Sequence, residues 1–310
     1  MSQQPTQPHA LIIGESLIDI IDTETGHTKE HPGGSPMNVA VGLARLARPV
    51  HLATSYALDP RGKQLHTHLT DEHITITPGS NTAARTSTAH ATIDATGSAT
   101  YQFDVHWDRP PINITNNTCI VHAGSFSAIT EPGATHVREA IAVARATATI
   151  TYDPNARPSL MGTPRHAYTH MERLIGMADI VKVSDEDIHW ITDGTINPLT
   201  VAENWLRHGP SLVVITRGAK GADALTRNGV AITVETPTVN VVDTVGAGDS
   251  FMAALIDGLW TAGLLGADHR NDLADIDHTT LTNIIRRCSH ISGITITRAG
   301  ANPPTLEELT

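Results

Sequence analysis

Lysine is scarce in this sequence, and acidic residues outnumber basic ones. Four lysines occur in 310 residues, and 21 Lys and Arg against 32 Asp and Glu give a formal net charge of −11. Nucleic-acid binding depends on many Lys and Arg side chains that neutralise phosphates. The composition therefore excludes a broad basic face, and we expect no nucleic-acid partner.

Cysteine is also scarce, and long apolar runs are missing. Cys119 and Cys288 form neither a closely spaced metal-binding pair nor a disulfide framework, which indicates a reducing compartment. Residues 1–9 lack the basic and apolar regions of a secretory signal, and no later run is long enough to span a membrane. We expect a cytoplasmic protein with no membrane partner.

Short apolar runs alternate with stretches in which apolar residues recur every three or four positions. The runs predict strands over 10–14, 50–54, 119–124, 147–152, 180–183 and 212–216, and the stretches predict helices that include 36–46, 132–146 and 199–207. This alternation favours the α/β class, with a mostly parallel sheet covered by helices on both faces.

Two regions break the alternation and predict a small separate sheet. They are residues 16–31 and residues 84–107, and the second is expected to fold as two strands around a turn at 94–97. Later in the chain, Asn228-Gly229 lies between two apolar runs and predicts a hairpin at the end of the main sheet. Residues 268–277 are expected to be a solvated connection between helices.

The most informative segment is 242–251, in which Gly246, Ala247 and Gly248 precede Asp249 and apolar residues at helical spacing follow. The glycines lie where a loop enters a helix, and the amides and dipole there favour an oxyanion or phosphoryl group. Asp249 suits the role of a base that takes a proton from a substrate hydroxyl while the amides stabilise the transferred phosphoryl group. The alternative is a structural helix N-terminus in which Asp249 only complements the dipole.

A second glycine site, Gly33-Gly34, opens another helix that contains Asn38 and the sequence Leu-Ala-Arg-Leu at 43–46. Neither glycine site is G-x-x-x-x-G-K-S/T, which excludes a P-loop. Neither is G-x-G-x-x-G after the first strand, which disfavours a nicotinamide-dependent dehydrogenase.

Together the two sites resemble the signatures of the ribokinase-like (PfkB) family of carbohydrate kinases, in the family's order, and the resemblance extends over residues 14–304. The first signature is the Gly-Gly pair with its Asn and Leu-Ala-Arg-Leu helix, and the second is Asp-Thr-x-Gly-Ala-Gly-Asp-x-Phe at 243–251. The pattern is most similar to that of bacterial fructokinases. The resemblance implies a three-layer α/β/α fold in one kinase domain, 1–310, with 16–31 and 84–107 as a β-sheet lid whose edges often pair subunits into homodimers.

The resemblance also implies a sugar site. The residues at the positions of this site are Asp19, Gly33, Gly34 and Asn38. The resemblance also assigns Asp249 as the base, with Gly246, Ala247 and Gly248 as the anion hole beside it. Residues 153–158 look like the Asp-Pro-Asn-x-Arg segment of bacterial fructokinases, which places Arg157 near the sugar or the transferred phosphate. The structural alternatives are an edge-strand polar residue for Asp19 and a surface arginine for Arg157.

ATP and Mg²⁺ are the implied cofactors. The positions that match the family's nucleotide site are Lys182, Ser184, Asp187, Thr216, Gly218, Gly221 and Ser289, with His290 as the alternative to the last. Asp187 would reach magnesium through water, although Ser184 and Asp187 also spell a helix capping box. Some relatives hold a monovalent cation such as K⁺ with the Asp of the second signature, which is Asp243 in this sequence. A Ser found in ribokinases is replaced here by Pro304.

The expected activity is therefore that of an ATP-dependent sugar kinase. Fructose is the preferred acceptor because of the segment 153–157, the strand 101–103 of the expected lid and the Lys-x-Ser pattern at 182–184. Ribose, 2-keto-3-deoxygluconate and a nucleoside remain as alternative acceptors, because the hydroxyl-reading residues of the lid vary in this family. A non-catalytic sugar-binding regulatory protein is the alternative that is not an enzyme.

Overall fold

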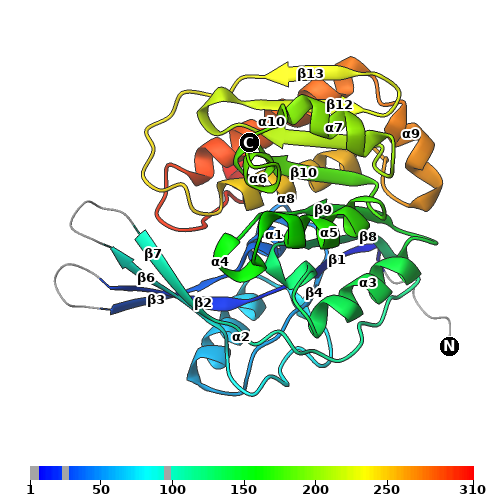
Figure 1. Ribbon diagram of the computed structural model, residues 1–310. Coiled ribbons are helices and arrows are strands. Elements are labelled where there is room, and N and C mark those ends of the chain that lie inside the picture. Colours follow the sequence, from blue (N-terminus) through cyan, green and yellow to red (C-terminus); the bar gives the residue numbers. More distant parts are fainter. Residues whose placement is uncertain (1–6, 23–27, 94–98) are drawn as a thin grey trace.

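The computed structural model describes residues 7–22, 28–93 and 99–310, and its largest element is a nine-stranded sheet (Figure 1). The strand order is β13-β12-β11-β10-β9-β8-β1-β4-β5. The strands are β1 (His9–Ile13), β4 (Val50–Ala53), β5 (Thr75–Ile76), β8 (Thr118–Gly124), β9 (Thr149–Asp153), β10 (Ile180–Ser184), β11 (Leu212–Thr216), β12 (Ala222–Thr226) and β13 (Ala231–Val234). All neighbours pair in parallel except β12 and β13, which continue the sheet antiparallel.

Helices cover both faces of this sheet. Alternate strand residues supply the two apolar layers, so that Ile12 belongs to one core cluster and Ile13 to the other. The first layer includes α1 (Ser35–Arg45), α2 (Pro60–Asp71), α8 (Ala247–Thr261) and α10 (His278–Thr295); the second includes α3 (Gly133–Ala144), α5 (Pro164–Ile175), α6 (Asp185–Ile191) and α7 (Pro198–Leu206). The expected α/β class with three layers is confirmed.

Helices α1 and α8 pack against each other within the first layer. A Cβ atom added at Gly42 of α1 would lie 2.7 Å from the Cβ of Ala253 in α8. Because real side chains do not approach so closely, the glycine is what allows the two helix backbones to cross at this short distance.

A separate four-stranded sheet projects from the body of the molecule at the left of Figure 1. Its order is β3-β2-β6-β7, with β2 (Leu17–Asp22), β3 (Thr28–Gly33), β6 (Thr88–Ile93) and β7 (Ala99–Asp104). We call it the small sheet. Its strands come from the two regions that break the sequence alternation, while the expected turn at 94–97 lies outside the described residues.

The hairpin predicted from Asn228-Gly229 is confirmed, since β12 and β13 pair across it. The prediction for 268–277 was wrong in part, because this segment contains a short 3₁₀ turn (Ala267–His269) and α9 (Arg270–Ala274). Leu273 packs into the first core layer, and Arg270 Nε donates to Asp179 Oδ1 at 2.7 Å. The acidic residues around Leu273 hid the apolar contact from the sequence pattern.

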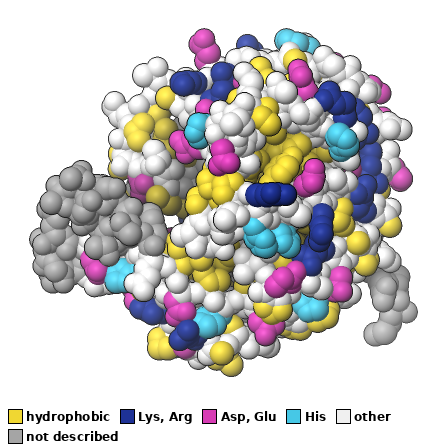
Figure 2. Space-filling view, in the orientation of Figure 1, with side chains coloured by type: hydrophobic (Ala, Val, Ile, Leu, Met, Phe, Trp, Pro, Cys, Tyr) yellow, Lys and Arg dark blue, Asp and Glu magenta, His cyan; other side chains and the backbone are white. Residues whose placement is uncertain are grey.

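Charged side chains of both signs are spread over the face of the molecule shown in Figure 2. Among the described residues, no helix combines the length and apolar character needed to cross a bilayer.

The carboxyl ends of the parallel strands form the edge on which ligands bind in α/β proteins. From β1 the chain continues through the small sheet and α1 to β4 on one side, whereas β8 on the other side of β1 connects through α3 to β9. Because α1 and α3 cover opposite faces, the strand order reverses between β1 and β8, which is where a ligand site is expected.

Candidate active site

The N-termini of α1 and α8 meet at the carboxyl edge of the main sheet. Asp249 lies in the first turn of α8 and is only 7% exposed. The hydroxyl of Ser35 donates to its Oδ1 atom at 2.7 Å, and the amide of Asn38 donates to its Oδ2 atom at 2.8 Å. The two glycine signatures, 214 residues apart at the Ser35–Asp249 contact, thus form one site.

Glycine is required at the residue that precedes each of these helices. Gly34 has φ 115°, and a Cβ atom there would lie 2.6 Å from the backbone oxygen of Glu15. Gly246 has φ 77°, and its Cβ would lie 2.6 Å from the Cβ of Ala301. At the start of α8 the first backbone amides have no acceptor within the helix, so this helix end can hold an anion.

Lys182 in the middle of β10 lies next to the N-terminus of α8. Its Nζ atom would be 3.0 Å from a Cβ atom added at Gly248, so a side chain at that position would fill the space between the helix and the ammonium group. Nζ donates to Asp153 Oδ2 at 2.8 Å, and both side chains are almost fully buried. A positive charge next to the amides strengthens an anion site.

The pKa values of this buried pair agree with a charged pair at neutral pH. Burial raises the pKa of Asp153 to about 6, although Lys182 lowers it. Burial acts to lower the pKa of Lys182, but the carboxylates of Asp153, Asp249 and Asp187 raise it overall. Asp153 Oδ1 has no hydrogen-bond partner among the residues that the structure describes.

Asp19 and Arg157 lie where the small sheet meets the main sheet. A Cβ atom at Gly33 would lie 2.0 Å from Asp19 Oδ2, so the carboxylate occupies the space above this glycine. Burial raises the pKa of Asp19 to about 6; the charge of Arg157 opposes this shift, and that of Asp249 adds to it. Asp19, Arg157 and Asp249 therefore belong to one electrostatic cluster.

A model of pfkB family carbohydrate kinases matches residues 7–308 of this sequence. The chain belongs to this family. It is accordingly a carbohydrate kinase, an enzyme that transfers a phosphoryl group to a sugar hydroxyl, and the family and enzyme class expected from the two signatures are confirmed.

Curated relatives of this pfkB family kinase are named as fructokinases. The chain is 33% identical to a fructokinase of Rhizobium leguminosarum bv. trifolii over 287 residues, which cover 88% of the chain and 85% of the relative. It is 30% identical to the probable fructokinase-3 of Arabidopsis thaliana, with 94% and 86% covered.

Solved structures show the same fold. The fructokinase of Xylella fastidiosa with bound ATP superposes with a TM-score of 0.82 at 24% identity, covering 97% of this chain and 96% of that one. A double mutant of the fructokinase of Vibrio cholerae O395, in a form with fructose, ADP and potassium ion, superposes with a TM-score of 0.78 at 25% identity, covering 96% and 95%.

Ser184 and Asp187 of this kinase form a helix capping box at the start of α6. Asp187 N donates to Ser184 Oγ at 2.9 Å, and Ser184 N donates to Asp187 Oδ2 at 3.3 Å. Asp187 Oδ1 accepts from the backbone N of Ala156 at 2.8 Å, which ties α6 to the loop after β9. The carboxylate thus has a structural role, and its predicted link to magnesium stays a prediction.

Thr216 ends β11, and Gly218 and Gly221 lie in the connection to β12, at the same edge of the sheet. The segment forms a 3₁₀ turn (Gly218–Lys220), and Gly221 N donates to Gly218 O at 3.1 Å. Gly218 has φ 53°, and a Cβ atom there would meet nothing within 4 Å, so the turn is open toward a ligand.

Asp243 joins the loop before α8 to the segment after α10. Its Oδ1 atom accepts from Val245 N at 3.0 Å and its Oδ2 atom from Gly300 N at 2.8 Å. On α10, Ser289 is buried and His290 is exposed. Among the described residues, no group of three or more His, Cys, Asp or Glu side chains could hold a metal ion.

Three residues of the site had no role assigned from the sequence. Ser35 lies within the first signature, and Asn155 lies within the Asp-Pro-Asn-x-Arg segment, so their neighbourhood was the signal. Glu15 directly follows Gly14; it is 4% exposed, and its Oε2 atom has no hydrogen-bond partner within the described part of the chain. Burial raises its pKa to about 7, against the hydroxyls of Ser127 and Ser125, which lower it.

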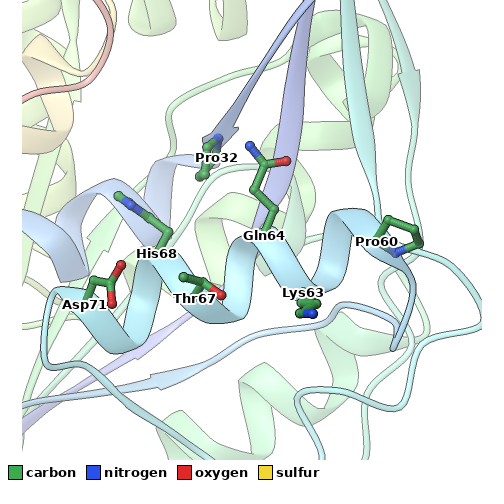
Figure 3. Close-up of a pocket in the computed structure, with 7 residues that line it drawn as sticks. All are labelled: Pro32, Pro60, Lys63, Gln64, Thr67, His68 and Asp71. Atoms are coloured by element: carbon green, nitrogen blue, oxygen red, sulfur yellow. The ribbon is translucent and has the colours of Figure 1, made fainter.

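A surface pocket of about 480 Å³ lies away from these groups, along the outer face of α2 (Figure 3). Pro32 of β3 closes one side of it, and the other lining residues are Pro60, Lys63, Gln64, Thr67, His68 and Asp71. No residue of the predicted site lines this pocket, and nothing about its lining matches the chemistry at Asp249.

Proposed function

We propose that this pfkB family kinase transfers the γ-phosphoryl group of ATP to fructose. The observation that carries the proposal is the buried carboxylate of Asp249, which two side-chain donors hold in the first turn of α8, a helix whose start has no side-chain cap. The relatives named as fructokinases, and a solved relative described with fructose and ADP, support the choice of acceptor.

In the proposed mechanism, the sugar lies against Asp19, Gly33, Gly34, Asn38 and Arg157, beneath the small sheet. Asp249 takes the proton from the attacking hydroxyl, which makes that oxygen a better nucleophile. The new oxygen–phosphorus bond forms as the bond between the γ-phosphorus and the bridging oxygen breaks, and ADP leaves. The amides of Gly246, Ala247, Gly248 and Asp249 donate to the phosphoryl oxygens as negative charge moves toward them. Lys182 adds a fixed positive charge next to the same amides.

We place the nucleotide at the edge of the main sheet formed by β10, β11 and α8. In the proposal, the open turn at Gly218, with Thr216 and Gly221, accommodates the nucleotide phosphates. Ser184, Asp187 and Ser289 are assigned to the same nucleotide site. Magnesium bound with the nucleotide supplies positive charge to the phosphoryl oxygens, and Asp187 would reach it through water. Asp243 is the side chain that would hold K⁺, near Gly300.

We also propose that residues 1–310 form one kinase domain that acts in the cytoplasm, with the small sheet as its lid. Closure of the lid would exclude water and limit hydrolysis of ATP. The small sheet has β3 and β7 at its edges, and an edge strand can pair with a second copy, which supports a homodimer through the lid.

An ADP-release assay tests the proposed function. Fructose, ribose, 2-keto-3-deoxygluconate and adenosine are compared at equal concentration, each with Mg²⁺ alone and with K⁺ added. We expect the highest kcat/KM with fructose. Faster turnover of another acceptor would replace fructose as the substrate, and ADP release with none of them would favour a sugar-binding regulatory protein.

A further inference from the structure

We propose that Asn155 and Ser35 are positioning residues that hold the carboxylate of Asp249 through a directed chain of hydrogen bonds. The chain runs from Arg157 Nη1 to Asn155 Oδ1 at 2.7 Å, from Asn155 Nδ2 to Ser35 Oγ at 2.6 Å, and from Ser35 Oγ to Asp249 Oδ1 at 2.7 Å. This inference rests on the proposed role of Asp249 as the base.

The direction of the chain is fixed from both of its ends. The guanidinium of Arg157 can only donate, so the Asn155 atom that faces it must be the carbonyl oxygen. The amide nitrogen of Asn155 then faces Ser35 and donates to its hydroxyl oxygen, which leaves the hydroxyl proton for Asp249. A carboxylate can only accept, so the other end requires the same direction. Hydrogen bonds aligned in this way polarise one another.

Hydrogen bonds hold the backbone around Asn155 in place. Asn155 has φ 38°, a left-handed conformation that Asn adopts more readily than most residues. Arg157 Nη1 also donates to the backbone oxygens of Asn155 and Ala156, at 3.2 and 3.0 Å. The backbone N of Ala156 in turn donates to Asp187 in the capping box of α6. The loop is therefore anchored to the main sheet layer independently of α8.

The chain of hydrogen bonds gives the carboxylate of Asp249 a second anchor. Asn38 donates to Oδ2 from α1, and Ser35 donates to Oδ1, so the carboxylate cannot rotate without losing one of these bonds. Its remaining lone pairs keep one orientation, which is what a base needs to meet a bound hydroxyl in a reactive geometry. Without Asn155, the Ser35 hydroxyl oxygen accepts no hydrogen bond from the amide, and the hydroxyl proton is no longer directed toward Asp249.

A double-mutant cycle tests the chain. Ser35→Ala removes the hydroxyl, and Asn155→Gly removes the amide while allowing the positive φ. We expect each variant to lower kcat by about 10- to 100-fold with KM for ATP unchanged. Because Asn155 acts through Ser35, the double variant should be no slower than Ser35→Ala alone. Ser35→Thr keeps a hydroxyl and should restore most of the rate.

Ser80→Ala is the matched control, since Ser80 is a buried serine whose hydroxyl accepts from Thr54 N at 3.2 Å, outside the chain. Its kcat should stay within about twofold of that of the parent. Additive losses of kcat in the double variant, or a Ser35→Ala enzyme with full kcat, would overturn the proposed hydrogen-bond chain. Neither result would affect the proposed role of Asp249 as the base. An Asp249→Asn enzyme with full turnover would instead overturn the proposed function itself.

Discussion

At the scale of single residues, the site contains buried carboxylates that differ in their partners. Asp249 accepts from two neutral side chains, Asp153 pairs with Lys182, and Glu15 has one oxygen without a partner in the described structure. A carboxylate held by neutral donors beside an anion site is free to take a proton, whereas one paired with an ammonium group serves as its counter-ion. The hydrogen-bond partners thus distinguish a carboxylate that could accept a proton, Asp249, from one with a structural role, Asp153.

Replacement of Asp249, the proposed base, gives the first prediction. Asp249→Asn keeps the shape of the side chain but removes its ability to take a proton, so kcat should fall roughly 10²- to 10⁴-fold. Binding of the sugar, measured by isothermal titration, should change little, because Asp19 and Arg157 remain. A variant that loses sugar binding together with turnover would assign Asp249 to the sugar site rather than to proton transfer.

Replacement of Lys182 gives a prediction about stability. Lys182→Met leaves Asp153 without its counter-ion in the core, which should lower the free energy of unfolding by about 3–5 kcal/mol. The double replacement Lys182→Met with Asp153→Leu removes both charges and should recover most of this loss. Urea denaturation of the three proteins measures both quantities. Equal instability of the single and double variants would show that the methionine packs badly, whatever the charge.

At the scale of elements, each helix N-terminus of the site depends on a glycine whose surroundings leave no room for a side chain. At α8 this dependence can be separated from the conformational preference of glycine. Gly246 precedes the helix with φ 77°, and Gly263 follows it with φ 72°. A Cβ atom would meet Ala301 at Gly246 but nothing within 4 Å at Gly263.

The two ends of α8 therefore form a matched pair of variants. Gly263→Ala should cost about 1 kcal/mol for its positive φ alone. Gly246→Ala should cost about 1–2 kcal/mol more, because the methyl group displaces the segment around Ala301, and it should raise KM for ATP. Thermal unfolding and steady-state kinetics measure the two effects. Identical losses at both ends would mean that contact with Ala301 does not matter.

Elements that depend on local signals were predictable from the sequence. The strands of the main sheet other than the two-residue β5, the hairpin at Asn228-Gly229 and the starts of α1 and α8 follow from apolar runs and glycines close together in the chain. The parallel pairing of β2 with β6 was not predictable, because it joins segments about 70 residues apart without a turn to set the register. The contacts of Ser35 with Asn155 and Asp249 are also non-local and appear only when the first turns of α1 and α8 meet the loop after β9.

At the scale of the whole molecule, burial of acidic groups near the site links stability to pH. Glu15 has a pKa raised from 4.5 to about 7. Between these two values the folded protein binds more protons than the unfolded chain, so the contribution of Glu15 to stability is present below about pH 4.5 and is lost as the pH rises through 7. The shifts of Asp19 and Asp153 have the same sign, with a window that ends near pH 6.

Glu15→Gln should remove this dependence at one position. At pH 8 the variant avoids the cost of a buried charge and should be more stable than the parent by roughly 1–3 kcal/mol. At pH 4, where Glu15 is protonated in both states, the difference should vanish. Chemical denaturation at the two pH values measures it. A variant that is equally destabilised at both would show that the carboxyl group makes a contact that the amide cannot replace.

The close crossing of α1 and α8 at Gly42 and Ala253 has a consequence for how this enzyme could change its acceptor. The crossing locks together the two helices that carry Ser35, Asn38 and Asp249, so the spacing of the reactive groups is a constant of the scaffold. The small sheet is built from other segments of the chain, those that form β2, β3, β6 and β7. If the proposed roles hold, acceptor preference can change through substitutions in the small sheet while the groups proposed for phosphoryl transfer keep their spacing.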